Sequence, residues 1–387
     1  MENISNVKIE IENFKTFKDK IILEINDDKF VISIIGRNAS GKSTIFEAIE
    51  NLKKILTLEN NYNIKDFYKP YLFDDKTSNM ECYYSISWKK LDKKYKYYIK
   101  FNSQEIIEEI LKNGDKTYFE RNKNSLKVDK TEFSIAKGAI SYSSLFLLSI
   151  NKNVNNKDSK DFLDLFDIIN DIGSNIQVYN KSREENFIDA VISNIKNEKI
   201  SDIISEADPT LVKIISEEID KDLKEKVENI ESEDPNLNKN PIYKPYGLHS
   251  VNEKFYRLDF NDESEGTRKL FLLMPVIMNV FKNGSYLFID ELDSSIHQDI
   301  VVDIIIKLFN NKNLNKNNAK LIFSMHNLGM LFKKDFDKYV ELYGIKAIDN
   351  SRKLEKIDIS SNKETINTII QGNSNFTPGI VDDYLNN

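Results

Sequence analysis

Cysteine is almost absent from this sequence, because Cys82 is the only one among 387 residues. A single cysteine excludes an internal disulfide and a metal site built from several cysteines, and it is typical of proteins from a reducing cytosol. Histidine is nearly as rare, and His249, His297 and His326 are too scattered to indicate a zinc site. We therefore expect a cytoplasmic protein that carries neither a disulfide nor zinc.

A long apolar run is also missing. No segment approaches the roughly 20 consecutive apolar residues that a membrane-spanning helix needs, and the N-terminus is polar with mixed charge, unlike a signal peptide. Hydrophobic residues make up 40% of the chain and charged residues 30%, which fits a soluble protein with a sizeable core. We therefore expect no membrane partner, and the length predicts two or three domains, or one large domain with an insertion.

Excess positive charge is lacking as well, since the formal net charge is -7 at pH 7. A protein that binds nucleic acid over its whole surface is usually basic, so only a local patch would serve such a partner here. One candidate patch lies near residue 90, although the solvated rim of a β-hairpin is the favoured interpretation. It consists of Lys89, Lys90, Lys93, Lys94 and Lys96. Direct binding of nucleic acid therefore stays open.

The first third of the chain has the pattern of β-strands with one helix. Alternating apolar residues predict strands at 7–11 and 21–25, each with one face toward a core. Segment 30–35 is apolar almost throughout, which is typical of a strand buried on both faces in a mostly parallel sheet. A helix is expected after Ser43. Its apolar side consists of Ile45, Ala48, Ile49, Leu52 and Ile55.

Further strands are expected at 82–88 and 95–101, with another hairpin across 117–133. From about 145 to 230 the apolar spacing turns helical, and 203–227 is a charged amphipathic stretch. Residues 234–245 are rich in proline and asparagine and predict a linker or loop. The sheet pattern resumes at Phe255.

Three elements near the C-terminal end carry candidate functional residues. Segment 267–281 predicts an apolar helix, and segments 286–290 and 320–326 predict buried strands that end in acid and in histidine. We expect the chain to divide into an N-terminal part of one head (1–140), an inserted helical subdomain (141–245) and a C-terminal part of the same head (246–387). The predicted fold class is α/β.

A phosphate-binding loop follows the buried strand at 30–35. The spacing G-x-x-x-x-G-K-S after a strand and before a helix is the context that identifies such a loop. Its glycines let backbone N–H groups converge on phosphates, and the helix N-terminus adds partial positive charge. Lys42 is expected to reach the β- and γ-phosphates of ATP, and Ser43 to hold Mg²⁺. The nucleotide-binding residues are predicted to be Gly36, Arg37, Asn38, Ala39, Ser40, Gly41, Lys42, Ser43 and Thr44.

Asp290 and Glu291 follow a short apolar run, in the manner of a strand that ends in acid. We expect this strand to lie beside the strand that precedes the loop, so that Asp290 joins Ser43 in holding Mg²⁺. Glu291 would then polarise a water for in-line attack on the γ-phosphate. For Asp293, Ser294 and Ser295 the simpler interpretation is that they cap a helix starting near Ile296.

A turn of small residues, Ser264-Glu265-Gly266-Thr267-Arg268, opens the helix at 267–281 and forms a second potential anion site. Within one subunit, a γ-phosphate does not need two such sites. In a head-to-tail dimer, however, each subunit offers this turn to the nucleotide that the other subunit holds. His326 ends a buried strand, where a neutral imidazole can bond a γ-phosphate oxygen or the attacking water. The order of these motifs favours catalytic roles for Glu291, Lys42 and His326 over purely structural ones.

These motifs in this order resemble the ABC-type ATPase heads, a class shared by transporter subunits, SMC-type repair proteins and OLD-like ATPases. Within that class the sequence resembles bacterial abortive-infection ATPases of the AbiL/RloA-like kind. The resemblance rests on the stretches Asn13-Phe14-Lys15-Thr16-Phe17, Tyr118-Phe119-Glu120-Arg121, His249, 263–270, Phe288-Ile289-Asp290-Glu291-Leu292-Asp293 with His297, and 321–326.

The resemblance implies a P-loop NTPase head with a mostly parallel mixed sheet, an antiparallel β layer and an inserted helical lid. It implies that Ser264 and Gly266 act on the nucleotide of a second subunit, that Asp293 lies in a loop crossing the dimer interface, and that His326 is the switch histidine. It also places Asn13 and Lys15 near the base or ribose. The sequence departs from the class at Asn327, where aspartate is more common.

The implied function is an ATPase switch in anti-phage defence, acting as a homodimer or higher even oligomer that controls a separate effector such as a nuclease. About 220 residues separate Ser43 from Ser264, too few for an SMC coiled coil, and 61 residues follow His326, too few for a fused nuclease. Two alternatives stay open: a DNA-repair ATPase that binds DNA directly, and a non-hydrolysing ATP-bound scaffold. A transporter subunit is a more distant one.

Overall fold

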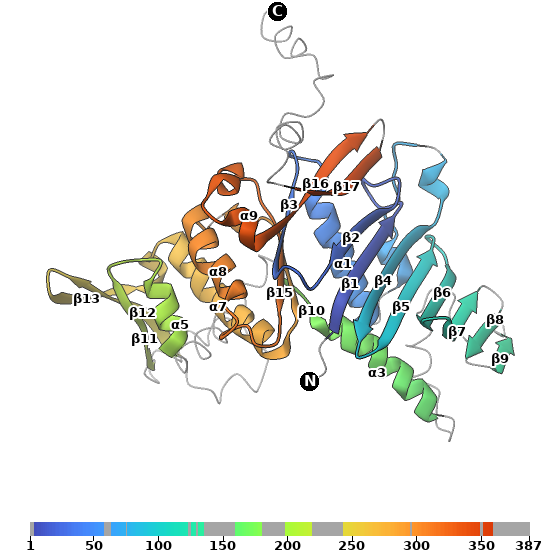
Figure 1. The fold of residues 1–387 in the computed structure, drawn as a ribbon, viewed down its shortest axis with the longest axis horizontal. Coiled ribbons are helices and arrows are strands. Elements are labelled where there is room, and N and C mark those ends of the chain that lie inside the picture. Colours follow the sequence, from blue (N-terminus) through green and yellow to red (C-terminus); the bar gives the residue numbers. More distant parts are fainter. Residues whose placement is uncertain are drawn as a thin grey trace, which may run out of the picture.

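The computed structural model describes residues 4–57, 63–74, 76–122, 125–128, 131–134, 159–179, 198–218, 243–294, 296–348 and 351–358. Within these residues the chain forms three β-sheets, and helices pack between and beside them (Figure 1). Among them no helix combines the length and apolar character needed to cross a bilayer.

The central sheet has six strands in the order β10-β14-β15-β3-β16-β17. The first five run parallel, and the last is antiparallel to its neighbour. The strands are β10 (Ile176–Tyr179), β14 (Tyr286–Ile289), β15 (Lys320–Ser324), β3 (Val31–Ile35), β16 (Val340–Ile348) and β17 (Ser351–Ile357). Every residue of β3, β14 and β15 is buried, which confirms the interpretation of these apolar runs as strands covered on both faces.

Helices cover the two faces of this sheet. Ile32 and Ile34 of β3 pack with the apolar side of α1 (Lys42–Thr57), which has the predicted helical spacing. Val31 and Ile35 point the other way and pack with α7 (Glu265–Asn283). The same face is also covered by a helical segment that includes η7 (Ile300–Ile306) and α8 (Lys307–Asn310). Because successive side chains of β3 point to opposite faces of the sheet, they contribute to two separate layers of the core.

An eight-stranded antiparallel sheet packs on the other side of α1, with the order β2-β1-β4-β5-β6-β7-β8-β9 (blue to cyan in Figure 1). The strands are β1 (Ile4–Glu12), β2 (Ile21–Ile25), β4 (Cys82–Lys90), β5 (Lys93–Phe101), β6 (Ile106–Asn113), β7 (Lys116–Asn122), β8 (Ser125–Val128) and β9 (Thr131–Ser134). Helix α3 (Ser159–Asn175) lies against α1. Its Gly173 permits the contact, because a Cβ there would lie 2.8 Å from Leu56 Cβ.

A third sheet stands apart from the other two (Figure 1). It consists of β11 (Leu211–Glu218), β12 (Tyr243–Val251) and β13 (Lys254–Asp259), and α5 (Glu198–Ser205) packs beside β11. Strand β13 is an edge strand exposed over most of its length. It continues through η5 (Phe260–Asp262) directly into the turn that opens α7. The remaining short helices are η1 (Ile64–Phe67), η2 (Thr77–Asn79), η6 (Leu292–Ser294), η8 (Leu328–Phe332) and α9 (Phe336–Tyr339).

The helical prediction for 145–230 is wrong in two places. Residues Ile176–Tyr179 form β10, an edge strand of the central sheet, and Leu211–Glu218 form β11. The first run has only four residues and follows α3 without a turn, and apolar residues in the second fit either period, so spacing alone misassigned both. The predicted linker ends in residues that belong to β12. Much of 141–245 lies outside the described residues, and the three-part division of the chain stays a prediction.

Candidate nucleotide-binding site

The phosphate loop joins β3 to α1, as predicted, and its geometry depends on glycine. Gly41 has φ +108°, and a Cβ at this position would lie 2.6 Å from Thr16 Oγ1 and 3.0 Å from the Phe17 ring. Gly36 is similarly tight, because a Cβ there would lie 2.5 Å from Ser40 Oγ. Side chains therefore cannot intrude at these two positions, and the loop backbone is left to line the site.

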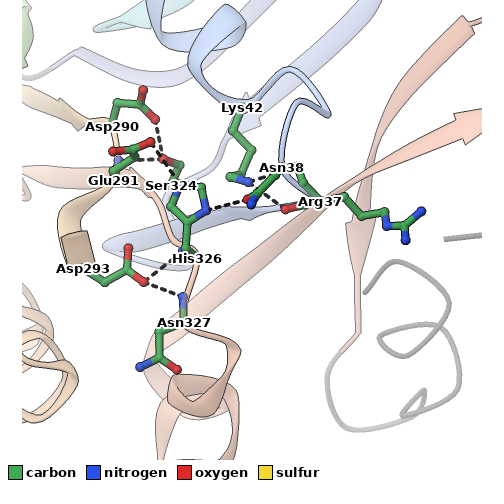
Figure 2. Close-up of polar contacts among 10 residues, drawn as sticks. Arg37, Asn38, Lys42, Asp290, Glu291, Asp293, Ser324, His326 and Asn327 are labelled. Carbon is green, nitrogen blue, oxygen red and sulfur yellow. Dashed lines mark hydrogen bonds and ion pairs between the residues drawn. The ribbon is translucent and has the colours of Figure 1, made fainter. Parts of the chain in front are cut away.

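Lys42 turns back over this loop (Figure 2). Its Nζ donates hydrogen bonds to the carbonyl oxygens of Gly36 at 2.7 Å and Arg37 at 3.2 Å, and the residue is buried. Burial lowers the pKa of Lys42, and the carboxylates of Asp290 and Glu291 act in the opposite direction without forming an ion pair with it. A buried cation whose hydrogen-bond partners, among the described residues, are carbonyls is suited to an incoming anion, as a phosphate-binding lysine must be.

The strand arrangement that positions the acidic residues after β14 differs from the predicted one. β14 is not the neighbour of β3, because β15 lies between them; the expectation that the two strands lie side by side is wrong. β15 instead contributes Ser324, whose hydroxyl donates to Asp290 Oδ1 at 2.5 Å and accepts the backbone N–H of Glu291 at 2.7 Å. Glu291 itself has φ +52°, a conformation that this buried serine helps to hold.

His326 links the acidic strand end to the phosphate loop (Figure 2). Its Nε2 lies 3.1 Å from Glu291 Oε1, and its Nδ1 lies 3.1 Å from Asn38 Oδ1. A doubly protonated ring donates to both oxygens, and a neutral ring satisfies both contacts once the Asn38 amide is turned over. The structure thus brings together three of the predicted residues in one chain of contacts.

Asp293 holds the turn that carries His326. Its Oδ2 accepts the backbone N–H groups of His326 at 2.9 Å and Asn327 at 2.5 Å. The helix that follows begins at residue 298, so the simpler interpretation of Asp293 as the cap of that helix is wrong. Ser295 lies outside the described residues. A carboxylate that accepts two successive backbone amides at a strand end fixes the orientation of the side chain between them.

Two oxygen ligands for a cation are available at this site. Ser43 is exposed at the start of α1, and Asp290 is oriented by Ser324. Throughout the described part of the chain, this site included, no three His, Cys, Asp or Glu residues cluster in a way that could hold a metal on their own. Mg²⁺ commonly uses one or two protein ligands and completes its shell with phosphate oxygens and water. Ser43 and Asp290 therefore have the chemistry of Mg²⁺ ligands, and their joint action on a nucleotide-bound ion stays a prediction.

The turn at Ser264 is held by local contacts. Ser264 caps α7, and its Oγ accepts the backbone N–H of Thr267 at 3.0 Å. No hydrogen bond or ion pair among the described residues connects Ser264 or Gly266 to the phosphate loop. The contacts of the described residues therefore do not join the two motifs within one chain.

Asn13 and Lys15 are engaged in structural contacts. The Asn13 amide donates to the carbonyl of Thr77 at 3.0 Å, and its Oδ1 accepts the N–H of Tyr71 at 3.0 Å, so this buried side chain has no group left for a base or ribose. Lys15 pairs with Glu47 of α1. The predicted base contact of Asn13 does not fit this geometry.

Ser324 is a residue of the candidate site that the sequence argument missed. The available signal was a small hydroxyl residue inside an otherwise apolar strand, Leu321-Ile322-Phe323-Ser324-Met325, immediately before His326. A serine in a buried strand more often satisfies its own backbone than another strand's carboxylate. Only the strand order shows that its hydroxyl faces Asp290.

The central parallel sheet, the loop between β3 and α1 and the acidic strand end define a P-loop nucleotide-binding fold. More narrowly, the chain belongs to the family described as "AAA domain, putative AbiEii toxin, Type IV TA system", which matches residues 31–331. No curated protein matches the chain.

Solved structures with a similar arrangement include SMC heads and a recombination mediator. The SMC head domain from Thermotoga maritima is 13% identical, with a TM-score of 0.46 over 92% of this chain and 99% of that chain. The Smc head domain bound to the C-terminal domain of ScpA from Pyrococcus furiosus is 14% identical, with a TM-score of 0.49 over 96% and 100%. The recombination mediator protein RecF-ATPrS is 13% identical, with a TM-score of 0.41 over 92% and 100%.

Proposed function

We propose that this chain binds and hydrolyses ATP with Mg²⁺ and acts as a dimeric nucleotide switch. The observation that carries the proposal is the contact chain from Asn38 through His326 to Glu291, set beside the buried Lys42. A carboxylate, an imidazole and a lysine ammonium thus lie beside the phosphate loop (Figure 2). This is the combination of groups that phosphoryl transfer to water requires.

Each side chain has a distinct role in this proposal. Lys42 exchanges its two carbonyl contacts for phosphate oxygens, and the loop N–H groups of residues 36–44 bind the remaining oxygens. Ser43 and Asp290 hold Mg²⁺, which neutralises charge on the phosphates when it is bound. Glu291 accepts a proton from the attacking water, and His326 holds Glu291 and senses the γ-phosphate.

The second subunit supplies what one chain lacks. Ser264 and Gly266 form a helix N-terminus that is suited to an anion but has no phosphate loop bonded to it within the described part of the chain. In a head-to-tail dimer each such turn would meet the nucleotide held by the other copy. ATP would then favour the closed dimer, and hydrolysis would remove the contacts that close it.

The output of the switch would be control of a separate effector, such as a nuclease, during phage infection. Two things support this step: the resemblance to abortive-infection ATPases, and a family description that includes a putative toxin of a toxin–antitoxin system. Fold alone does not name a partner.

Phosphate release and ATP-dependent dimerisation test the proposal. We expect the purified protein to release phosphate from MgATP, and E291Q to lose turnover while it accumulates as an ATP-bound dimer in size-exclusion chromatography. K42A is the matched control that should neither bind nor dimerise. A wild type that binds ATP without releasing phosphate would leave only the scaffold function, and E291Q that stays monomeric with ATP would overturn the switch.

A second function, direct binding of nucleic acid, has one observation in its favour. At one end of the antiparallel sheet, lysines lie opposite one another on neighbouring strands. Lys89 is opposite Lys94, and Lys96 is opposite Lys112. Directly opposed like charges are unfavourable, and a polyanion would relieve them. Lys96 has one acidic partner, Glu10 at 3.4 Å.

Salt-dependent binding separates this function from the first. Phosphate contacts release counterions, so the affinity for a DNA duplex should fall steeply as salt rises. The variant K89A/K94A should flatten that slope and leave ATP turnover unchanged. Equal, salt-insensitive binding by both proteins would remove direct nucleic-acid recognition from consideration.

A further inference from the structure

The residue immediately before the Ser264 turn is a buried carboxylate. Only 2% of the Glu263 side chain is exposed, and its Oε1 lies 2.8 Å from His249 Nε2 on strand β12. A buried carboxylate needs such a partner, because an uncompensated buried charge is strongly destabilising. Glu263 is therefore fixed to the third sheet at the point where the chain enters the turn.

His249 is itself fixed from its other nitrogen. Its Nδ1 lies 2.8 Å from Thr210 Oγ1, and the Thr210 hydroxyl donates to Asp208 Oδ1 at 2.9 Å. With that hydroxyl proton directed at Asp208, the imidazole donates from Nδ1 to the Thr210 oxygen. The ring is thus bonded at both ends, and its orientation toward Glu263 is set by the loop before β11.

Gly247 makes room for this contact. A Cβ at Gly247 would lie 1.8 Å from Glu263 Oε1 and 2.9 Å from His249 Nε2. Any larger residue on this side of β12 would displace the carboxylate from the imidazole. The strand therefore provides both the partner of Glu263 and the space that it occupies.

We propose that the His249–Glu263 pair is a positioning device for the Ser264 turn, so that sheet β11–β13 sets where Ser264 and Gly266 stand. The inference rests on the proposed action of that turn on the nucleotide of a second copy. Glu263 adjoins Ser264 in the chain, and Ser264 is the residue that caps α7. A shift of Glu263 is therefore passed to the turn through one peptide unit, while the phosphate loop, Lys42 and Glu291 stay in place.

Three variants disturb the pair in different ways. H249A removes the imidazole, and G247A forces the carboxylate aside without changing either partner. E263Q is the conservative variant, because its amide oxygen can still accept a hydrogen bond from the imidazole. S250A, one residue from His249 on the same strand, is the matched control. Thermal melting identifies any variant that does not fold, and G247A keeps the test available if H249A fails.

The measurement compares ATP binding with dimerisation and turnover. We expect H249A and G247A to bind a fluorescent ATP analogue as the wild type does. Their kcat should fall roughly ten- to a hundredfold, the range expected for a misplacement of about 1 Å. In the E291Q background their ATP-dependent dimer should weaken, while E263Q and S250A remain close to the parent.

The outcomes separate this inference from the proposed function. If E291Q alone never dimerises with ATP, the action of the turn on a second copy is wrong and the positioning role is wrong with it. If E291Q dimerises and folded H249A and G247A dimerise and turn over equally well, only the positioning role is overturned. Loss of analogue binding in both variants would also overturn it, because the pair would then act on the phosphate loop of its own chain.

Discussion

Ser324 and Asp290 are joined by a hydrogen bond of 2.5 Å, and the same serine oxygen accepts the backbone N–H of Glu291 at 2.7 Å. One buried hydroxyl on β15 thus holds both acidic residues at the end of β14. Strand β15, which lies between β3 and β14, therefore contributes a side chain to the proposed site.

Removing this hydroxyl should impair turnover more than nucleotide binding. In S324A, Asp290 loses a donor and Glu291 loses an acceptor for its N–H, so the carboxylate proposed to activate water is less well placed. We expect kcat to fall by roughly ten- to a hundredfold, with a smaller change in the affinity for ATP. Steady-state kinetics and a binding titration measure the two effects.

Ser33 on the adjacent strand β3 provides a matched control. It is also fully buried, and its hydroxyl has no hydrogen-bond partner among the described residues. S33A should therefore leave kcat unchanged. Equal losses in both variants would show that β15 matters only through packing.

The buried ammonium group of Lys42 should lower the stability of the folded protein when no nucleotide is bound. Because burial lowers its pKa in the folded state, folding is opposed while the ammonium is protonated, which includes neutral pH. We expect K42M to raise the melting temperature without nucleotide and to abolish the rise that ATP produces in the wild type. A lower melting temperature for nucleotide-free K42M would contradict the strain assigned to this cation.

Much of the site followed from local spacing, because a phosphate loop needs its strand, glycines and helix in direct succession. Lys42 stands in the predicted loop, and Glu291 and His326 follow the predicted buried strands; their catalytic roles stay predictions. The strand order did not follow, since β15 lies in the sheet between β3 and β14 although it comes after both of them in the sequence. A hydrophobic run indicates that a strand is buried, but it does not indicate which strands lie beside it in the sheet.

The contacts of isolated polar residues could not be predicted from the sequence pattern either. Asn13 stands in a motif that resembles a nucleotide contact, yet its amide bonds backbone carbonyls of a distant loop. His249 and Glu263 are 14 residues apart, and their contact depends on the register of β12. Periodicity cannot report such pairs, because they are set by tertiary packing.

Glu47 should make stability depend on pH at the acidic end. Burial raises its pKa, but hydrogen bonds from Lys15 and Lys69 outweigh this and leave the pKa below its ordinary value. A lowered pKa in the folded state contributes stability above the unfolded pKa, and that contribution is lost as pH falls through the folded value. We expect E47Q to be less stable than the wild type at neutral pH, with the difference vanishing in acid. Urea unfolding at several pH values measures it; a constant difference would contradict the assignment.

Arg121 and Glu109 form a buried ion pair within the antiparallel sheet, with Arg121 Nη1 3.6 Å from Glu109 Oε2 and both side chains at most 2% exposed. Tyr97 donates a hydrogen bond to Glu109 at 3.0 Å. Arg121 belongs to a stretch that resembles the ATPase class, but its burial indicates a structural role. Because removal of one partner leaves a buried charge, R121M should lower the free energy of unfolding by about 3–5 kcal/mol.

The double variant E109L/R121M distinguishes the pair from simple packing. Replacing both charges with apolar groups of similar size removes the stranded carboxylate, so much of the stability lost in R121M should return. Chemical denaturation of the two single variants and the double variant gives the coupling. Additive losses would mean that the two side chains contribute independently. ATP turnover should change little in any variant that folds, because this ion pair joins β6 and β7 within the antiparallel sheet.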